Sequence, residues 1–394
     1  MEKQSNDAKK PKKQHNTPAR NWVGDNGKII EPLFADYFLS LHPMRCFQGR
    51  LFTVDGMIED EAPLKKEIYE QVRYYATTSI ARRIEHIMQA IKLACASEPP
   101  EIQTDRIHVR NGTYFVDGHF TPEKEYCMNR LPIAYVPEAP APTRWLQFLN
   151  ELLYEEDIPA LQEYIGYCLL PVTKAQKMLL MVGKGGEGKS RIGLILRELF
   201  GSSMYTGSLQ KVETNRFARA DLEYKLLLVD DDMKTEALPQ TNNIKTLVTL
   251  EDKIDIERKG QQSVQGTLYV RFACFGNGSL HALYDKSNGF YRRQLLLTTK
   301  EKPVGRVDDP FLIDKMRGEK EGILLWALEG LHRLIRNNYQ FTISERTAAN
   351  LKEAMEQGNN ILGFLKSESY FEIRQGAKCK STDFYKVYER LSLI

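Results

Sequence analysis

Hydrophobic residues recur at intervals of three and four positions through much of the first part of the chain. In residues 65–96 (KKEIYEQVRYYATTSIARRIEHIMQAIKLACA) this spacing predicts helix, and Pro99 and Pro100 end the run. A further helical pattern covers residues 143–170. We therefore predict a mainly helical N-terminal domain over residues 29–170.

Two segments interrupt this helical pattern. Residues 106–120 (RIHVRNGTYFVDGHF) alternate apolar and polar positions around Asn111-Gly112, a pair favoured in tight turns, so we predict a β-hairpin. Residues 132–143 contain four prolines, which is typical of a linker or an extended strap.

After residue 174, short apolar runs alternate with helical patterns as far as residue 300. This alternation predicts an α/β fold with a largely parallel sheet, and we assign residues 171–310 to that core. A strongly apolar helix is predicted over residues 322–335, and mainly helical, charged sequence follows. We therefore assign residues 311–394 to a helical C-terminal segment.

Charge is concentrated at the start of the chain. The first twenty residues hold six Lys or Arg and two acidic residues, and the formal net charge of the whole chain is +3, so the remainder is close to neutral. We predict a basic disordered tail over residues 1–28. It serves either as a solvated leader or as an arm that touches phosphates.

Several patterns bear on location. No stretch of about 18 uninterrupted apolar residues is present, so we expect no membrane-spanning helix and no membrane partner. The first residues lack the apolar centre of a signal peptide. The six cysteines are scattered without a C-x-x-C motif, which argues against a zinc site or a disulfide framework. We expect a cytoplasmic protein.

The clearest chemical motif is G-x-x-x-x-G-K-S over residues 183–190 (GKGGEGKS), between a strand-like run and a helical run that Gly201 ends. Glycines let backbone N–H groups surround phosphate oxygens, and the helix N-terminus adds unpaired donors. We expect Lys189 to reach the β- and γ-phosphates of a nucleotide and Ser190 to bind Mg²⁺. The motif predicts these nucleotide-binding residues: Gly183, Gly185, Gly186, Glu187, Gly188, Lys189, Ser190 and Arg191.

Two later strands are predicted to end in polar residues. Residues 225–232 (KLLLVDDD) place carboxylates at the sheet edge where open α/β folds bind ligands. We predict that Asp230 contacts Mg²⁺ and that Asp231 orients the attacking water; the alternative is an acidic cap on a core strand. Asn277 follows the apolar run 269–276 and is a candidate for contact with the γ-phosphate or the water, although an Asn there is also common in turns.

Arg292 and Arg293 come next, just before another strand-like run. The planar guanidinium group suits phosphate, and in a ring such an arginine would serve the nucleotide of the neighbouring subunit. The alternative is a surface ion pair.

The order of these motifs within residues 183–293 resembles that of the superfamily 3 helicases of viruses and plasmids, and most closely the primase–helicase replication proteins of phages and plasmids. Residues 29–170 resemble the helical domain that precedes the ATPase in that group. The resemblance implies an AAA+-like P-loop ATPase core, ATP and Mg²⁺ as cofactors, a homo-hexameric ring and movement along DNA.

The resemblance also implies a hairpin that faces the central channel, here within residues 252–262. Ile254 and Ile256 alternate as in a strand, and Arg258 and Lys259 precede a glycine. These two cations are therefore candidates for contact with DNA phosphates without reading bases; the alternative is an ordinary charged turn.

Two features depart from the family pattern. Only the tail precedes the predicted helical domain, so we expect no primase module. Residues 381–388 (STDFYKVY) resemble the first helix of a winged-helix domain, and the sequence ends at Ile394, before a recognition helix or wing.

We therefore predict an ATP-dependent replicative DNA helicase of a phage, plasmid or other mobile element, acting on single-stranded and forked DNA in the bacterial cytoplasm. Host or element replication proteins are further candidate partners. One alternative is an ATP-controlled replication initiator or loader that binds DNA without unwinding it. Another is a different P-loop enzyme such as a small-molecule kinase, whose lid and acceptor patterns we do not find.

Overall fold

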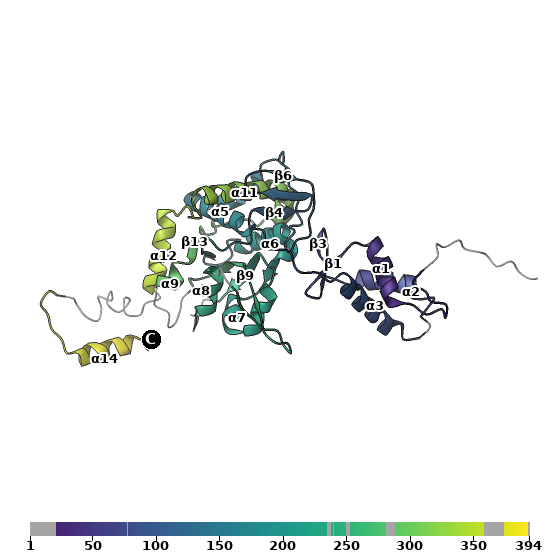
Figure 1. Ribbon diagram of the computed structural model, residues 1–394. Coiled ribbons are helices and arrows are strands. Elements are labelled where there is room, and N and C mark those ends of the chain that lie inside the picture. The colour runs from purple at the N-terminus through teal and green to yellow at the C-terminus, as the bar shows by residue number, and fades with distance from the viewer. Residues whose placement is uncertain are drawn as a thin grey trace, which may run out of the picture. The chain divides into compact units, whose positions relative to one another are not determined.

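The structure is a computed structural model that describes residues 21–76, 78–234, 238, 240–249, 253–280, 288–357 and 374–392. The chain divides into two compact units, Met1–Pro99 and Pro100–Ile394 (Figure 1). The division falls at the two prolines that end the first helical run. Residues 100–170, which we assigned to the N-terminal domain, therefore belong to the same unit as the α/β core.

The N-terminal unit packs three helices with a small antiparallel sheet of order β1-β2-β3. Its core includes Trp22, which is 1% exposed and meets Phe34 edge to face at 4.9 Å. The described part of the predicted tail is thus folded from residue 21 onward, because this indole fills the core. The elements are α1 (Glu31–Leu41), β1 (Arg45–Phe47), β2 (Arg50–Thr53), β3 (Gly56–Met57), α2 (Ala62–Val72) and α3 (Ile80–Ala94).

The long helical pattern of residues 65–96 forms two helices rather than one. Helix α2 ends at Val72, and Ser79, with a φ of 54°, precedes α3. A left-handed serine cannot continue a regular helix, so the chain turns there. In α3 the buried side chains of Ile87, Met88 and Ile91 follow the predicted helical spacing.

A second small sheet of order β4-β5-β6 begins the C-terminal unit. Its strands are β4 (Arg106–Val109), β5 (Gly112–Phe115) and β6 (Phe120–Thr121). The predicted hairpin is present, but Val109 pairs with Gly112, so the turn residues are Arg110 and Asn111. Gly112 instead lies in the strand, where an added Cβ would come within 2.1 Å of the Thr121 carbonyl oxygen.

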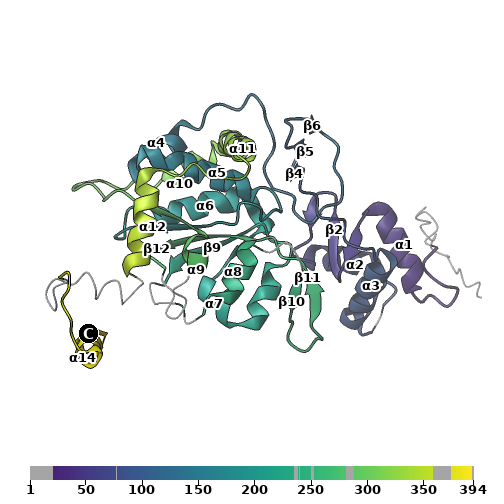
Figure 2. The same cartoon turned by 60° about the vertical axis from the view of Figure 1, so that its left-hand side comes forward.

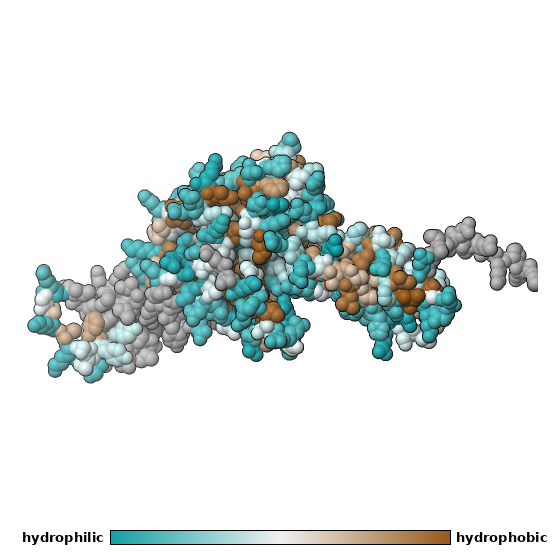
Figure 3. All heavy atoms as spheres, viewed as in Figure 1, coloured by the Kyte–Doolittle hydropathy of each residue, from teal (hydrophilic) through white to brown (hydrophobic). Residues whose placement is uncertain are grey.

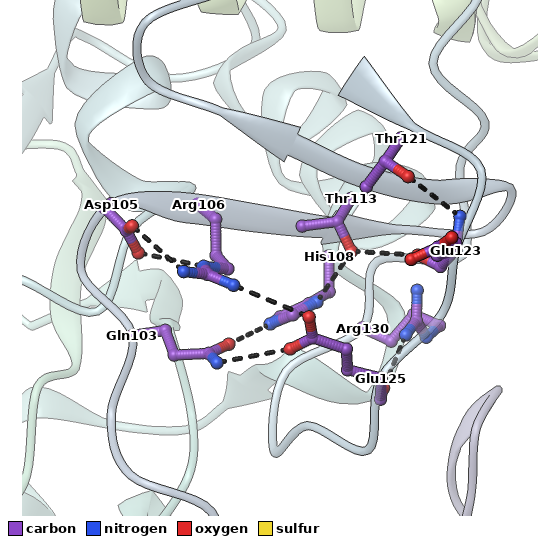
Figure 4. Close-up of polar contacts among 9 residues, drawn as sticks. All are labelled: Gln103, Asp105, Arg106, His108, Thr113, Thr121, Glu123, Glu125 and Arg130. Carbon is purple, nitrogen blue, oxygen red and sulfur yellow. Dashed lines mark hydrogen bonds and ion pairs between the residues drawn. The ribbon is translucent and has the colours of Figure 1, made fainter. Parts of the chain in front are cut away.

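A buried polar cluster holds the loops around this sheet (Figure 4). His108 lies between Gln103, at 2.7 Å, and Thr113, at 3.3 Å. Burial and the nearby Arg130 charge lower the pKa of His108 to about 4, so the imidazole is neutral near pH 7. Arg130 donates to the carbonyl groups of Val109, Gly112 and Glu125. These contacts give the cluster a structural role.

The proline-rich residues 132–143 are a strap within the C-terminal unit. Ile133 is fully buried, and its carbonyl accepts from the Arg110 N–H at 2.8 Å. The strap leads into the predicted helical stretch, which consists of α4 (Thr143–Leu152), the 3₁₀ turn η1 (Glu155–Asp157) and α5 (Ile158–Cys168).

The centre of the C-terminal unit is a parallel five-stranded sheet of order β13-β7-β12-β9-β8. Alternate residues of its strands enter two cores: Leu179 and Phe275 face one, and Leu180 and Cys274 the other. The predicted α/β fold with a parallel sheet is thus confirmed. The strands are β7 (Met178–Val182), β8 (Met204–Thr206), β9 (Leu227–Met233), β12 (Arg271–Gly276) and β13 (Gln294–Thr298).

Helices cover both faces of this sheet (Figure 2). One face is covered by α4, α5, α6 (Lys189–Phe200), α10 (Leu312–Arg317) and α11 (Lys320–Arg336). The other face is covered by α7 (Leu209–Thr214), α8 (Asn242–Thr249), α9 (Asn288–Tyr291) and α12 (Glu345–Gln357). The remaining elements are η2 (Gly201–Ser203), η3 (Arg216–Leu222), β10 (Ile254–Ile256), β11 (Val264–Gly266) and α14 (Ser381–Ser392).

None of the helices that the structure describes is long and apolar enough to cross a membrane. Figure 3 shows hydrophobic residues in separate patches on a largely hydrophilic face. Among the described cysteines, five are buried free thiols, and Cys379 is an exposed one.

A buried arginine ties α5 to the sheet. Arg271, on β12, is 2% exposed and donates to the carbonyl groups of Cys168 (2.8 Å), Leu170, Val172 (3.1 Å) and Tyr269. Carbonyl groups at a helix C-terminus lack intrahelical donors and carry partial negative charge. The guanidinium group therefore stabilises the end of α5 against the start of the strand that leads to Asn277.

Helices α5 and α11 approach closely because glycines lie at their contact. A Cβ added at Gly166 would come within 2.3 Å of the Ala327 carbonyl oxygen, and one at Gly330 within 2.4 Å of the Gln162 carbonyl oxygen. Neither helix can accept a larger residue here without moving away from the other.

Replacing Gly166 with alanine is expected to lower the free energy of unfolding by about 1–3 kcal/mol, because the added methyl group overpacks this contact. Gly318→Ala is the matched control. Gly318 has a φ of −64°, which alanine adopts readily, and the nearest atom to the new Cβ would be the Lys315 carbonyl oxygen at 3.3 Å. That control is expected to change stability by less than about 0.5 kcal/mol. Chemical denaturation followed by circular dichroism measures both, and equal stability of the two variants would contradict the packing argument.

Candidate nucleotide-binding site

The segment Gly183–Ser190, called the P-loop segment below, connects the carboxyl end of β7 to the N-terminus of α6. Gly185, Gly186 and Gly188 have φ values of 107°, 80° and 117°. Only glycine adopts such angles without strain, so these positions need it. Gly183 needs it for space, because an added Cβ would lie 2.2 Å from Thr299 Oγ1.

A buried ion pair closes the P-loop segment. Lys189 Nζ lies 2.9 Å from Glu187 Oε2, and the two side chains are 7% and 3% exposed. The other carboxylate oxygen of Glu187 accepts from the Gly185 N–H at 2.7 Å. Burial acts to raise the pKa of Glu187, but the hydrogen bonds from Lys189 and the loop N–H groups outweigh it, and the pKa is lowered overall.

Asn277 lies beside this pair. It follows β12, which runs parallel to β7, and its Oδ1 is 3.4 Å from Lys189 Nζ. The structure therefore brings together two residues that are 88 positions apart in sequence, at the sheet edge where the motif order predicted them.

Strand β9 places its aspartate carboxylates differently from our prediction. Asp230 is 6% exposed and accepts from the Leu209 N–H at 2.8 Å, on the α7 side of the sheet. Asp231 instead points to the α6 side, where its Oδ1 lies 3.8 Å from a Cβ built on Gly193, and its interaction with the Ser190 hydroxyl acts to lower its pKa. Alternate residues of a strand face opposite sides, so only one of these two neighbours can face the P-loop segment. Asp231, rather than Asp230, meets Ser190.

Burial raises the pKa of both carboxyl groups, and a hydrogen bond opposes the shift in each case, from the Leu209 N–H for Asp230 and from Ser190 for Asp231. The serine hydroxyl and the Asp231 carboxylate are oxygen donors of the kind that Mg²⁺ prefers. The pair therefore fits a magnesium ion at this edge.

A cavity of about 840 Å³ opens over the P-loop segment. That volume is within the range of small-ligand pockets. Its walls come from the P-loop segment, the ends of β9 and β12, the helices α4, α6 and α10, and the loop after β13. The lining includes Arg144, Phe148, Glu151, Lys189, Ser190, Arg191, Leu194, Asp231, Asp232, Asn277, Pro303, Arg306, Val307 and Leu312.

The sequence reasoning missed Arg306 and Phe148. The Arg306 guanidinium donates to the Glu187 carbonyl oxygen at 3.1 Å and pairs with Asp308 at 3.1 Å. Phe148 lies 3.4 Å from a Cβ built on Gly188. No motif marks either residue; the one available signal was that the loop after β13 begins at the same sheet edge as the P-loop segment.

Arg292 and Arg293 lie at the opposite edge of the sheet. They precede β13, whose first residue pairs with Met178 at the start of β7. The Arg292 carbonyl accepts from Lys177 at 2.5 Å, and the Arg293 guanidinium donates to the Gly289 carbonyl oxygen. A strand rises about 3.3 Å per residue, so the five residues of β7 separate the two edges by about 16 Å. These arginines are therefore not part of their own chain's cavity.

The predicted basic hairpin is formed by β10 and β11, in which Ile256 pairs with Val264. Arg258 turns back to form an ion pair with Glu223, whereas Lys259 is exposed in the turn. Of the two predicted DNA contacts, Lys259 is the cation that the hairpin presents to solvent.

Family comparisons match two parts of the chain. A model described as "D5 N terminal like" matches residues 36–153, and a "Family of unknown function (DUF5906)" matches residues 181–293. The second match spans the P-loop segment, the acidic strand and Asn277. No curated protein matches the chain in sequence.

Among solved structures, two apo structures of the NrS-1 C-terminal region align with TM-scores of 0.52 and 0.53 and identities of 12% and 13%. Each alignment covers 92% of this chain and 86% of that chain, and at such identity the likeness concerns fold alone. A JCV helicase structure aligns over 55% of this chain with a TM-score of 0.27 and 13% identity, which is too weak for an argument.

The parallel sheet with a glycine-rich loop between β7 and α6 defines an α/β fold similar to that of the NrS-1 C-terminal region. The D5-type match, the fold and the motif order agree with one another. These findings are consistent with the resemblance of the motif order to the phage and plasmid primase–helicases of superfamily 3.

Proposed function

We propose that the chain is an ATP-dependent replicative DNA helicase that binds ATP in the cavity over the P-loop segment. The observation that carries this proposal is the meeting of Lys189, Asn277 and the Ser190–Asp231 pair at one sheet edge. These groups supply a phosphate cation, an amide for the terminal phosphate and a magnesium site, which phosphoryl-transfer enzymes require.

Each residue has a distinct role in this proposal. The N–H groups of the P-loop segment and Lys189 bind the β- and γ-phosphates. Ser190 and Asp231 hold Mg²⁺, which when bound neutralises charge on the phosphate oxygens. Asn277 contacts the γ-phosphate or the attacking water. The pairing of β9 with β12 shifts register after Asp230, and Asp232 lines the same cavity as Asp231; in this proposal Asp232 orients that water.

The position of Arg292 and Arg293 supports a site shared between copies of the chain. Their edge of the sheet is remote from their own P-loop segment, so either can approach an ATP phosphate only in a neighbouring subunit. A ring supplies such a neighbour to every site, and we propose a homo-hexamer. There the nucleotide cycle moves the β10–β11 hairpin, and Lys259 draws the DNA backbone with it.

The proposal places the protein in the bacterial cytoplasm, in replication of a phage, plasmid or other mobile element. Its partners are single-stranded and forked DNA and other replication proteins. The alternative, an ATP-controlled initiator or loader, shares the site and differs in whether DNA strands are displaced.

Single-stranded DNA is expected to raise the ATP hydrolysis rate, because hydrolysis and DNA movement are coupled in a translocating motor. Lys189→Ala is expected to lose at least about a hundredfold in rate, because the main phosphate cation is removed. A phosphate-release assay with and without DNA measures both, followed by strand displacement on a forked duplex. Normal turnover by Lys189→Ala would contradict the site. Hydrolysis indifferent to DNA, without strand displacement, would favour the initiator or loader.

Lys259→Ala is expected to weaken single-stranded DNA binding severalfold at low salt and to reduce the slope of log Kd against log salt by about 1. The matched control is Lys352→Ala, since Lys352 is exposed on α12, which packs on the edge strand β13, whereas the hairpin packs on η3. Fluorescence anisotropy across a salt series measures both variants. Unchanged affinity of Lys259→Ala at every salt concentration would remove the hairpin from the DNA path.

A further inference from the structure

The cation of the P-loop segment already has an anionic partner within the chain. Lys189 is held by Glu187 at 2.9 Å, and this pair is more than nine-tenths buried. Glu187 also accepts a hydrogen bond from the Gly185 N–H, at 2.7 Å. An ammonium group and loop N–H groups are the donors that phosphate-binding loops offer to phosphate oxygens. One carboxylate therefore occupies two donors of the kind that a phosphate would use.

The ion pair between Lys189 and Glu187 changes the charge that an incoming nucleotide meets at the P-loop segment. Without Glu187, Lys189 would present an uncompensated positive charge to an incoming nucleotide. With it, the buried pair has no net charge, and the carboxylate repels the phosphates at close range. Such repulsion is strong where water is excluded, and it grows with the negative charge of the ligand.

We propose that Glu187 is a competing ligand within the P-loop segment, which contends with the nucleotide phosphates for Lys189 and so makes tight binding depend on Mg²⁺. This inference rests on the proposed nucleotide site. Nucleotide entry requires the carboxylate to give up Lys189 or share it. A Mg²⁺-bound nucleotide carries less negative charge and meets less repulsion than a free one, so Glu187 discriminates against the uncomplexed form.

Glu187→Gln removes the charge and keeps the shape. The amide oxygen of glutamine can still accept from the Gly185 N–H, so the loop retains that hydrogen bond. A purely structural role for Glu187 would thus be largely preserved in this variant, whereas a competing charge would be lost.

Glu301→Gln is the matched control. Glu301 pairs with Lys184 of the same P-loop segment at 2.5 Å, but these side chains are 73% and 77% exposed. The chemical change is identical and the location is close. Because an exposed pair is screened by water, its removal is expected to change nucleotide affinity by less than about twofold.

The test is the affinity of the full chain for ADP, measured by isothermal titration calorimetry in EDTA and again in Mg²⁺. Glu187→Gln is expected to bind ADP in EDTA at least about tenfold more tightly than the wild type. The gain in Mg²⁺ is expected to be smaller. Thermal melting of each variant without nucleotide checks that the fold is intact.

The outcomes separate this inference from the proposed function. Suppose that the wild type binds ADP in Mg²⁺, and that folded Glu187→Gln binds ADP in EDTA no more tightly than the wild type does. This result would overturn the inference and make Glu187 a positioning residue for Lys189. An equal gain with and without Mg²⁺ would also overturn the charge argument. No binding by either protein under both conditions would overturn the proposed function as well. If Glu187→Gln melts far below the wild type, the same comparison is made with Glu187→Ala, whose expected gain and overturning result are the same.

Discussion

The parallel register of β7, β9 and β12 is the constraint on which the site depends. Because these strands run the same way and β12 pairs with both of the others, their carboxyl ends meet at one edge. That edge receives the P-loop segment from β7, the carboxylates from β9 and Asn277 from β12. The buried Arg271 contacts at the start of β12 and the close α5–α11 contact hold the sheet and its covering helices in this arrangement.

Strong local patterns predicted the sheet and the glycine-rich loop well. The strand-like run before the glycine-rich loop forms β7 (Met178–Val182), and Gly201, with a φ of 47°, follows the end of α6 as predicted. These features depend on neighbouring residues, which a sequence shows directly. The break between α2 and α3 was not visible, because the apolar spacing continues through a connection in which Ser79 has a left-handed backbone.

Features set by tertiary contact could not be predicted in this way. The sequence places Asp230 and Asp231 side by side, and which of them faces Ser190 depends on the pleat of a strand that extends through both residues. Arg306 reaches Glu187 across 119 positions of sequence, from a loop without a motif. The sequence did not show the unit boundary at Pro99, because the helical pattern resumes at residues 143–170, which lie in the second unit.

We propose above all that the P-loop edge of one chain is completed by the arginine edge of another. Mixing inactive Lys189→Ala protein with inactive Arg293→Ala protein, and separately with Arg292→Ala protein, and measuring ATP hydrolysis tests it most directly. Partial recovery in one mixture is predicted, since some interfaces then pair an intact P-loop segment with an intact arginine. No recovery in either mixture, with assembly of the variants intact, would contradict a site shared between chains.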